Sequence, residues 1–145
     1  MVDVTRTFTV QQSMSKVTAF LRDFGNATQW DPGTESCEQI TAGDVALGTQ
    51  WHNKTKMYGV STELTYSLET DEPNHIVLKG ENKTATSIDD MTFSELSPSS
   101  TEITYHAHID FHGVAKLADP VAGLAFERVG DETVDGITKS VESLA

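Results

Sequence analysis

Residues 101–113 read TEITYHAHIDFHG, a stretch in which apolar and polar side chains alternate. Alternate side chains of a β-strand point to the same face. One face would carry Ile103, Tyr105, Ala107, Ile109 and Phe111, and the other His106, His108, Asp110 and His112. We predict a strand that packs its apolar face on a core and directs the histidine row away from it.

The histidine row raises the alternative of a metal site. Two imidazoles at alternate strand positions can converge on one ion, and Asp110 could supply a third ligand. However, four such residues span about 20 Å along a strand, so only neighbours could share an ion. A catalytic metal also needs a shielded pocket, which a solvent-facing row does not offer. We therefore predict no metal site and no cofactor, and we interpret any ion held by these residues as adventitious.

The rest of the chain extends the pattern in both directions. Alternation predicts further strands at 2–10, 35–41, 49–58, 60–69, 75–81 and 85–96, with a tight hairpin at Tyr58-Gly59. Helical spacing predicts a helix between Ser13 and Gly25, a short helical turn at 26–30, and a long helix from Asp119 to the end of the chain. This last helix contains Gly123, Gly130 and Gly136. The glycines indicate either that the helix closely approaches a neighbouring element or that tertiary packing holds the helix despite their low helix propensity. We expect residues 1–145 to form a single α+β domain built on an antiparallel meander.

The composition restricts the classes of partner. The formal net charge of −12 disfavours nucleic acid and anionic lipid surfaces, which carry the same sign. No apolar run reaches the roughly 18 to 20 residues that span a bilayer, so we expect no stable membrane insertion. The N-terminus lacks the apolar core of a signal peptide, and a single cysteine, Cys37, cannot form an internal disulfide. These features predict a cytoplasmic protein.

Five stretches of the sequence carry a resemblance to a known family. FTVQQSMSKVTAFLRDFGNATQWDPG (8–33) resembles its opening strand, helix and tryptophan-proline-glycine corner, and ESCEQITAGDVALGTQW (35–51) its second and third strands. DDMTFSEL (89–96) with TEITYHAHIDFHG resembles its last hairpin, and DPVAGLAFERVGDETVDGI (119–137) its terminal helix. The sequence resembles the START-like helix-grip superfamily, in the branch of polyketide cyclase/dehydrase and lipid transport proteins (SRPBCC).

This resemblance implies a curved seven-stranded antiparallel sheet around a long C-terminal helix, with two short helices after the first strand and a cavity between sheet and helix. A bent sheet and one helix cannot close tightly everywhere, and the remaining space takes side chains or a ligand. The residues expected to line the cavity, which could equally be ordinary core, are Trp51, Met57, Leu64, Tyr66, Met91, Phe93, Tyr105, Ile109, Phe111, Phe126 and Val129.

Catalysis would need an acid, a base or an oxyanion donor inside that cavity. The candidates are Tyr66, Tyr105 and Arg6. By alternation, Arg6 falls on the apolar side of the first strand, where a guanidinium could hold a carboxylate or polarise a carbonyl. Its guanidinium could also reach solvent from there. Asp89 and Asp90 are adjacent on the penultimate strand, so one of them could face inward. No Ser-His-Asp arrangement, phosphate loop or dinucleotide fingerprint supports another reaction class.

We predict that the protein binds a hydrophobic small molecule or lipid in the cavity. An aromatase/cyclase-type enzyme acting in the same cavity is the alternative, and a protein-interaction module with a filled cavity is a third reading. The sequence does not name the ligand and does not set the oligomeric state.

Overall fold

A computed structural model describes residues 1–57, 60–113, 115 and 119–145, without the side chains of Met57 and residues 119–122. The elements are β1 (Val2–Val10), α1 (Met14–Arg22), the 3₁₀ helix η1 (Phe24–Asn26), α2 (Ala27–Trp30), β2 (Thr34–Gln39), β3 (Gln50–Met57), β4 (Val60–Glu72), β5 (His75–Glu81), β6 (Ala85–Ser97), β7 (Ser100–Phe111) and α3 (Asp119–Glu142). The Tyr58-Gly59 hairpin predicted from the sequence lies outside the described residues.

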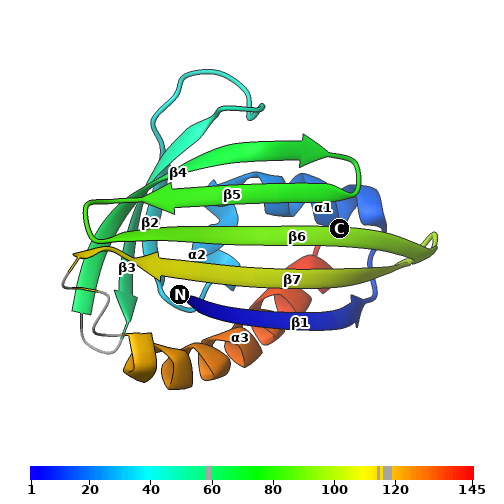
Figure 1. The fold of residues 1–145 in the computed structure, drawn as a ribbon. Helices are drawn as coiled ribbons and strands as arrows, with labels where there is room; N and C mark the ends of the chain where they lie inside the picture. The colour runs from blue at the N-terminus through cyan, green and yellow to red at the C-terminus, as the bar shows by residue number, and fades with distance from the viewer. Residues whose placement is uncertain (58–59, 114, 116–118) are drawn as a thin grey trace.

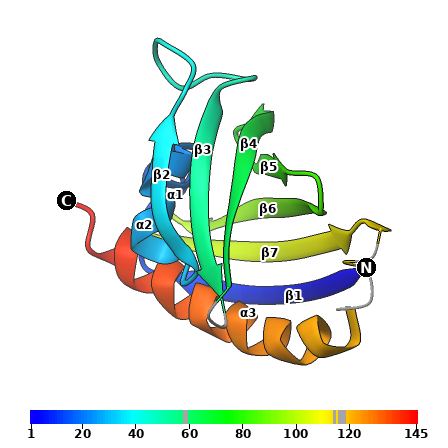
Figure 2. The same ribbon diagram turned by 90° about the vertical axis from the view of Figure 1, so that its left-hand side faces the viewer.

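The described strands form one seven-stranded antiparallel sheet in the order β1-β7-β6-β5-β4-β3-β2 (Figure 1). Only the contact between β1 and β7 joins strands that are distant in sequence, with Val4 opposite Ala107 and Phe8 opposite Ile103. Figure 2 shows β2, β3 and β4 turned steeply against β6, β7 and β1, while α3 runs along the β1 side. The predicted α+β helix-grip architecture, with its curved sheet, two short helices and long C-terminal helix, is confirmed.

Register shifts accompany the curvature of the sheet. They lie between Thr34 and Ser36 in β2, between Leu68 and Thr70 in β4, and between Glu95 and Ser97 in β6. An extra residue in one strand bends it and changes which side chains share a face. This explains why β4 continues to Glu72 although simple alternation predicted an end at residue 69.

The first helix is shorter than its apolar spacing predicted. α1 ends at Arg22, and Asp23 has extended backbone angles. The Asp23 carboxylate accepts a hydrogen bond from the Gly25 amide at 3.0 Å and so caps η1. Phe24 keeps the buried position that the helical pattern gave it, although it lies on a 3₁₀ turn.

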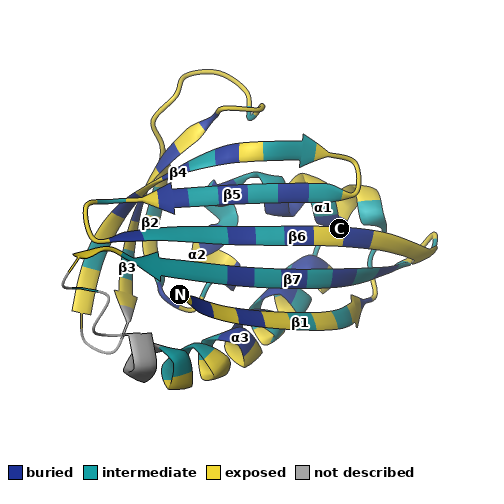
Figure 3. Ribbon diagram, in the orientation of Figure 1, coloured by how far each residue is buried: buried dark blue, intermediate teal, exposed yellow. Residues whose placement is uncertain are grey.

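The core lies on the concave side of the sheet. Inward residues of the strands pack there with Leu21 of α1, Trp30 of α2, and Ile137 and Val141 of α3. Gly136 allows α3 to approach α2, because a Cβ at this position would lie 2.2 Å from the Trp30 carbonyl oxygen. Figure 3 shows the resulting alternation of buried and exposed residues along the strands.

The C-terminal end of α1 is joined to the sheet by an ion pair. Arg22 Nε and Nη2 donate to the two carboxylate oxygens of Asp71 on β4, at 3.0 and 2.6 Å. This bidentate pairing fixes both planar groups at once. Among the described residues, no helix has the length and the apolar composition needed to cross a bilayer.

Candidate functional site

Most of the predicted cavity residues face the concave side of the sheet and are buried. Those belonging to the buried core are Trp51, Leu64, Tyr66, Met91, Phe93 and Tyr105. Ile109, Phe111, Phe126 and Val129 are only half-buried, and the side chain of Met57 lies outside the described residues.

Two helical aromatic residues fill the centre of the curved sheet. Phe24 of η1 lies 4.2 Å from the ring of Tyr66 and 6.2 Å from that of Trp51, measured between centroids. Trp30 of α2 makes an edge contact with Tyr105 at 6.3 Å. These aromatic contacts belong to the buried core. Phe24 was visible in the sequence as a helical apolar position, but its meeting with β3 and β4 was not.

The packing loosens toward one end of the sheet. On the inner face of β7, Ile103, Tyr105 and Ala107 are at most 5% exposed, whereas Ile109 and Phe111, farther along the same face, are half-buried. The helix shows the same gradient: Ile137 and Val141 of α3 are fully buried, and Phe126 and Val129 are half-buried. The inward apolar side chains at this end thus remain accessible to solvent.

A carboxylic acid lies on the inner face of β6, opposite Ala107 of β7. Asp89 of β6 is 7% exposed, and the Tyr105 hydroxyl donates a hydrogen bond to its Oδ1. Burial, followed by the nearby charge of Asp31, raises the pKa of Asp89 to about 7, against the lowering effect of the Tyr105 hydrogen bond. Asp89 has the strand parity of Met91 and Phe93, so the alternation that placed those residues inward could have selected it over Asp90.

Tyr66 brings a second hydroxyl to the same interior. Its side chain hydrogen-bonds Ser87 of β6, two residues from Asp89, and its cross-strand partner on β5 is Gly80. Burial and the charge of Asp89 raise the pKa of Tyr66, and burial with the same charge raises the pKa of Tyr105. Both tyrosines therefore stay protonated near neutral pH and can donate hydrogen bonds.

A separate group of polar side chains lies at the corner after α2. The Thr34 hydroxyl donates to Asp31 Oδ2 at 2.6 Å and accepts from Asn53 Nδ2 at 3.1 Å. Burial raises the pKa of Asp31, while the hydrogen bonds from Thr34 and from the Gly33 amide lower it. Burial also raises the pKa of Cys37 to about 11, so its thiol is not ionised at neutral pH.

The guanidinium of Arg6 lies between β1 and α3. Its Nη2 is 2.8 Å from a carboxylate oxygen of Glu127, and its Nε is 2.9 Å from Asp131 Oδ1. The Arg6 side chain is 26% exposed, and the side chains that it contacts by hydrogen bonds belong to α3. In the residues that the structure describes, it makes no side-chain hydrogen bond with Tyr66 or Tyr105, the other two catalytic candidates from the sequence. This geometry ties the helix to the first strand.

The histidine row lies on the outer face of the sheet. Asp3 Oδ1 of β1 is 2.8 Å from His106 Nε2 and 2.9 Å from His108 Nδ1, and His112 Nε2 is 3.1 Å from the Thr86 hydroxyl. The hydrogen bonds from His108 and His106 lower the pKa of Asp3. Within the described part of the chain, no group of three or more His, Cys, Asp or Glu residues is arranged to hold a metal ion.

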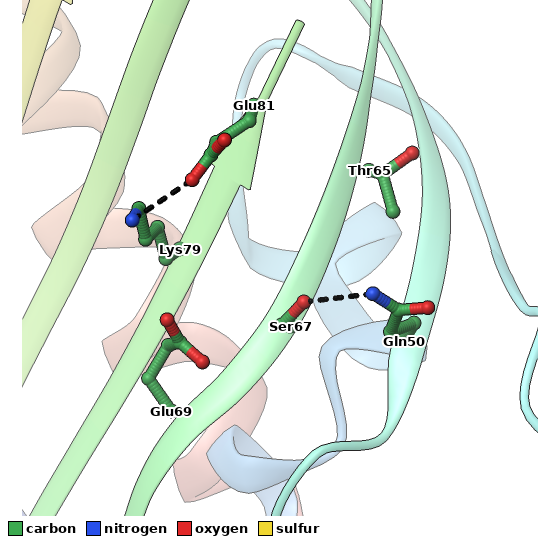
Figure 4. A pocket seen from close by; sticks show the side chains of 6 residues that line it. All are labelled: Gln50, Thr65, Ser67, Glu69, Lys79 and Glu81. Carbon is green, nitrogen blue, oxygen red and sulfur yellow. Dashed lines mark hydrogen bonds and ion pairs between the residues drawn. The ribbon is translucent and has the colours of Figure 1, made fainter.

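The outer face also carries a polar hollow of about 210 Å³. It is lined by Gln50, Thr65, Ser67, Glu69, Lys79 and Glu81 of β3, β4 and β5 (Figure 4). The Lys79 ammonium pairs with Glu81 at 2.8 Å, and Gln50 donates to Ser67 at 3.2 Å. Four of the six lining side chains pair in this way, and the hollow lies on the face opposite the core, so it differs from the predicted cavity.

A sequence family can now be assigned. The model of the family described as polyketide cyclase / dehydrase and lipid transport matches residues 1–142. The chain belongs to this family. The resemblance stated from the sequence is thereby confirmed, and membership suggests hydrophobic ligand binding or polyketide cyclase activity at the level of the family. No curated protein matches the chain in sequence.

Solved structures share the fold at low sequence identity. A START superfamily protein from Mycobacterium smegmatis is 16% identical with a TM-score of 0.82, and the match covers 99% of each chain. The Zhui aromatase/cyclase from Streptomyces sp. R1128 is 14% identical with a TM-score of 0.81, covering 97% of this chain and 93% of that one. The protein TTHA0849 from Thermus thermophilus is 11% identical with a TM-score of 0.79, covering 96% of each. At these identities the likeness shows the fold alone.

Proposed function

We propose that the protein binds a hydrophobic small molecule or lipid between the sheet and the N-terminal half of α3. The observation that carries this proposal is the gradient of burial along β7 and α3, where Ile109, Phe111 and Phe126 face the interior yet stay half-buried. A ligand there would remove this apolar surface from water, at about 25 cal/mol per Å². Asp89, Tyr105 and Tyr66 would orient its polar end.

We infer a cytoplasmic protein, as the sequence predicted, that takes up its ligand from solution or from a membrane surface without inserting.

Native mass spectrometry of freshly purified protein tests the proposal directly. We expect a mass increment that disappears on denaturation and corresponds to an apolar compound. A tryptophan at Ile109 should fill the space and abolish the increment, whereas Leu124→Trp should preserve it, since Leu124 of α3 is 83% exposed. Loss of the increment in both variants, or its absence in the wild-type protein together with no uptake of apolar probes, contradicts binding.

A second candidate function is supported by the proton-bearing groups in the interior. An aldol cyclisation needs a base to take a proton from carbon and an acid to protonate the carbonyl oxygen. Asp89 could act as the base and Tyr66 or Tyr105 as the acid in an aromatase/cyclase-type enzyme. Incubation with a linear poly-β-ketone, followed by mass spectrometry for loss of water, separates this activity from binding alone, because Tyr105→Phe should reduce turnover more than it reduces affinity.

A further inference from the structure

The titratable groups that face the interior of the sheet are all acids. Asp89, Tyr66 and Tyr105 come from β6, β4 and β7, and Asp31 acts on them from the corner after α2. Among the described residues, the charges that perturb these three groups are all negative. A ligand entering this interior therefore meets a negative potential.

Two of the described arginines are held in ion pairs. Arg6 pairs with Glu127 and Asp131 at the edge of α3, and Arg22 pairs with Asp71 on β4. On β3, Lys54 and Lys56 are exposed and alternate with the inward residues Trp51 and Asn53. Among the described residues, no basic side chain perturbs the pKa of Asp89, so no cation lies close enough to pair with a carboxylate ligand there.

The carboxylate of Asp89 has unused capacity as an acceptor. A carboxylate offers about four lone-pair sites on its two oxygens. Within the described residues, its one side-chain hydrogen bond comes from the Tyr105 hydroxyl. A buried carboxylate with free lone pairs gains most from an added donor, because burial has removed the water that would otherwise hydrate it.

We propose that the interior selects hydrophobic ligands whose polar end donates a hydrogen bond to Asp89, a hydroxyl or an amine, and rejects those that end in a carboxylate. This inference rests on the proposed function and specifies its ligand class. A carboxylate placed at Asp89 would repel both Asp89 and Asp31 and would lack a counter-ion. A hydroxyl or an ammonium would donate hydrogen bonds to the unused lone pairs of Asp89 without that repulsion.

The buried indoles do not reverse this preference. Trp30 Nε1 and Trp51 Nε1 have no hydrogen-bond partner among the described residues. They are neutral donors, which can bond either a hydroxyl oxygen or a carboxylate oxygen, and they supply no positive charge to offset Asp89.

Three probes with the same ten-carbon chain test the inference: decanol, decylamine and decanoate, titrated calorimetrically at pH 8. We expect decanol and decylamine to bind the wild-type protein, and decanoate to bind at least tenfold more weakly than decanol. Decylamine binding more tightly than decanol assigns the preference to charge, and equal binding assigns it to hydrogen bonding; both outcomes support the inference.

Two neighbouring variants separate the interior from the surface. Asp89→Asn should reduce the discrimination against decanoate to less than threefold, since the amide carries no charge. Asp90→Asn is the matched control, because Asp90 faces outward, 2.8 Å from His75, and should leave the discrimination unchanged. If Asp89→Asn proves too unstable to test, Asp89→Leu, which removes the same charge, should likewise reduce the discrimination against decanoate.

The outcomes distinguish this inference from the function beneath it. Equal affinity of the wild-type protein for decanol and decanoate overturns the selectivity and leaves hydrophobic binding intact. The same loss of discrimination in Asp90→Asn as in Asp89→Asn also overturns it. Failure of all three probes to bind removes the proposed function, and the inference with it.

Discussion

The ring of Tyr66 lies against Gly80, its cross-strand partner on β5, so closely that a Cβ at residue 80 would be 2.5 Å from Tyr66 Cε2. Glycine is required here because any side chain would enter the volume of the ring. The Tyr66 ring also packs against Phe24. The position of the Tyr66 hydroxyl in the interior therefore depends on a missing side chain on the neighbouring strand.

Gly80→Ala should displace the Tyr66 ring and lower the free energy of unfolding by about 1–3 kcal/mol, the usual cost of overpacking a filled core. Urea denaturation measures the loss. In a Tyr66→Leu background the same substitution should cost less, and the difference is the coupling between the two residues. An equal cost in both backgrounds would show that the ring is not the cause.

Two glycines of α3 should respond in opposite ways to alanine. Gly136→Ala would place a Cβ 2.2 Å from the Trp30 carbonyl oxygen and should destabilise the protein by more than about 2 kcal/mol, since the atom it meets belongs to the backbone and cannot rotate away. At Gly123 a Cβ would meet no atom within 4 Å, so alanine should stabilise the helix by up to about 1 kcal/mol. Thermal unfolding of both variants checks the pair, and a similar melting temperature for the two would contradict the close packing of α3 on α2.

Asp89 should make the stability of the protein depend on pH. Its pKa is about 7 in the folded protein against an ordinary 3.8, so the folded state holds the proton more tightly than the unfolded state. Stability from this group is therefore present below pH 4, falls as pH rises from about 4 to about 7, and is constant above that. As the pH rises from 5 to 8, we expect the free energy of unfolding of Asp89→Asn to increase by on the order of 2 kcal/mol relative to that of the wild-type protein.

Denaturation at several pH values measures this gain. The comparison between variant and wild type is needed because burial also raises the pKa of Asp31, which contributes with the same sign. Parallel pH profiles for the two proteins would show that Asp89 ionises in the folded state as it does in water.

Arg6 should contribute modestly to stability through α3. Its partners Glu127 and Asp131 have side chains that are 61% and 74% exposed. Exposed ion pairs are worth little and weaken with salt, so Arg6→Gln should cost about 1 kcal/mol or less, and less still at about 1 M salt. Binding of apolar probes should not change. A large loss of binding or turnover with unchanged stability would instead show that Arg6 acts in the site, as its position on the apolar side of β1 suggested.

Local sequence patterns were sufficient for the elements of the fold. Alternation located β1 and β5 at their observed ends, and it placed Tyr105, Met91 and Phe93 on the inner face. Alternation failed at the bulge between Leu68 and Thr70, where the period of two breaks. Helical spacing failed at Asp23, where α1 ends and η1 begins. Alternation reports the face of a strand only while the register is regular.

The sequence predicts which side chains of the candidate site face inward, but it does not predict their contacts. Parity restricts Asp89 to the inner face, but it does not say that a tyrosine hydroxyl sixteen residues away meets it or that Asp31 lies near enough to act on its charge. Such contacts depend on strand register and on how far the sheet curves, which are set by packing over the whole core.

The sequence by itself determined the seven-stranded antiparallel sheet, the terminal helix and the outward direction of His106 and His108, because periodicity is a property of the chain alone. Only the tertiary structure decided that Arg6 meets Glu127 and Asp131, that Gly136 lies against Trp30, and that Asp89 is buried beside Tyr105. These pairings join residues far apart in sequence, and they exist because closing the core brings distant elements within contact distance.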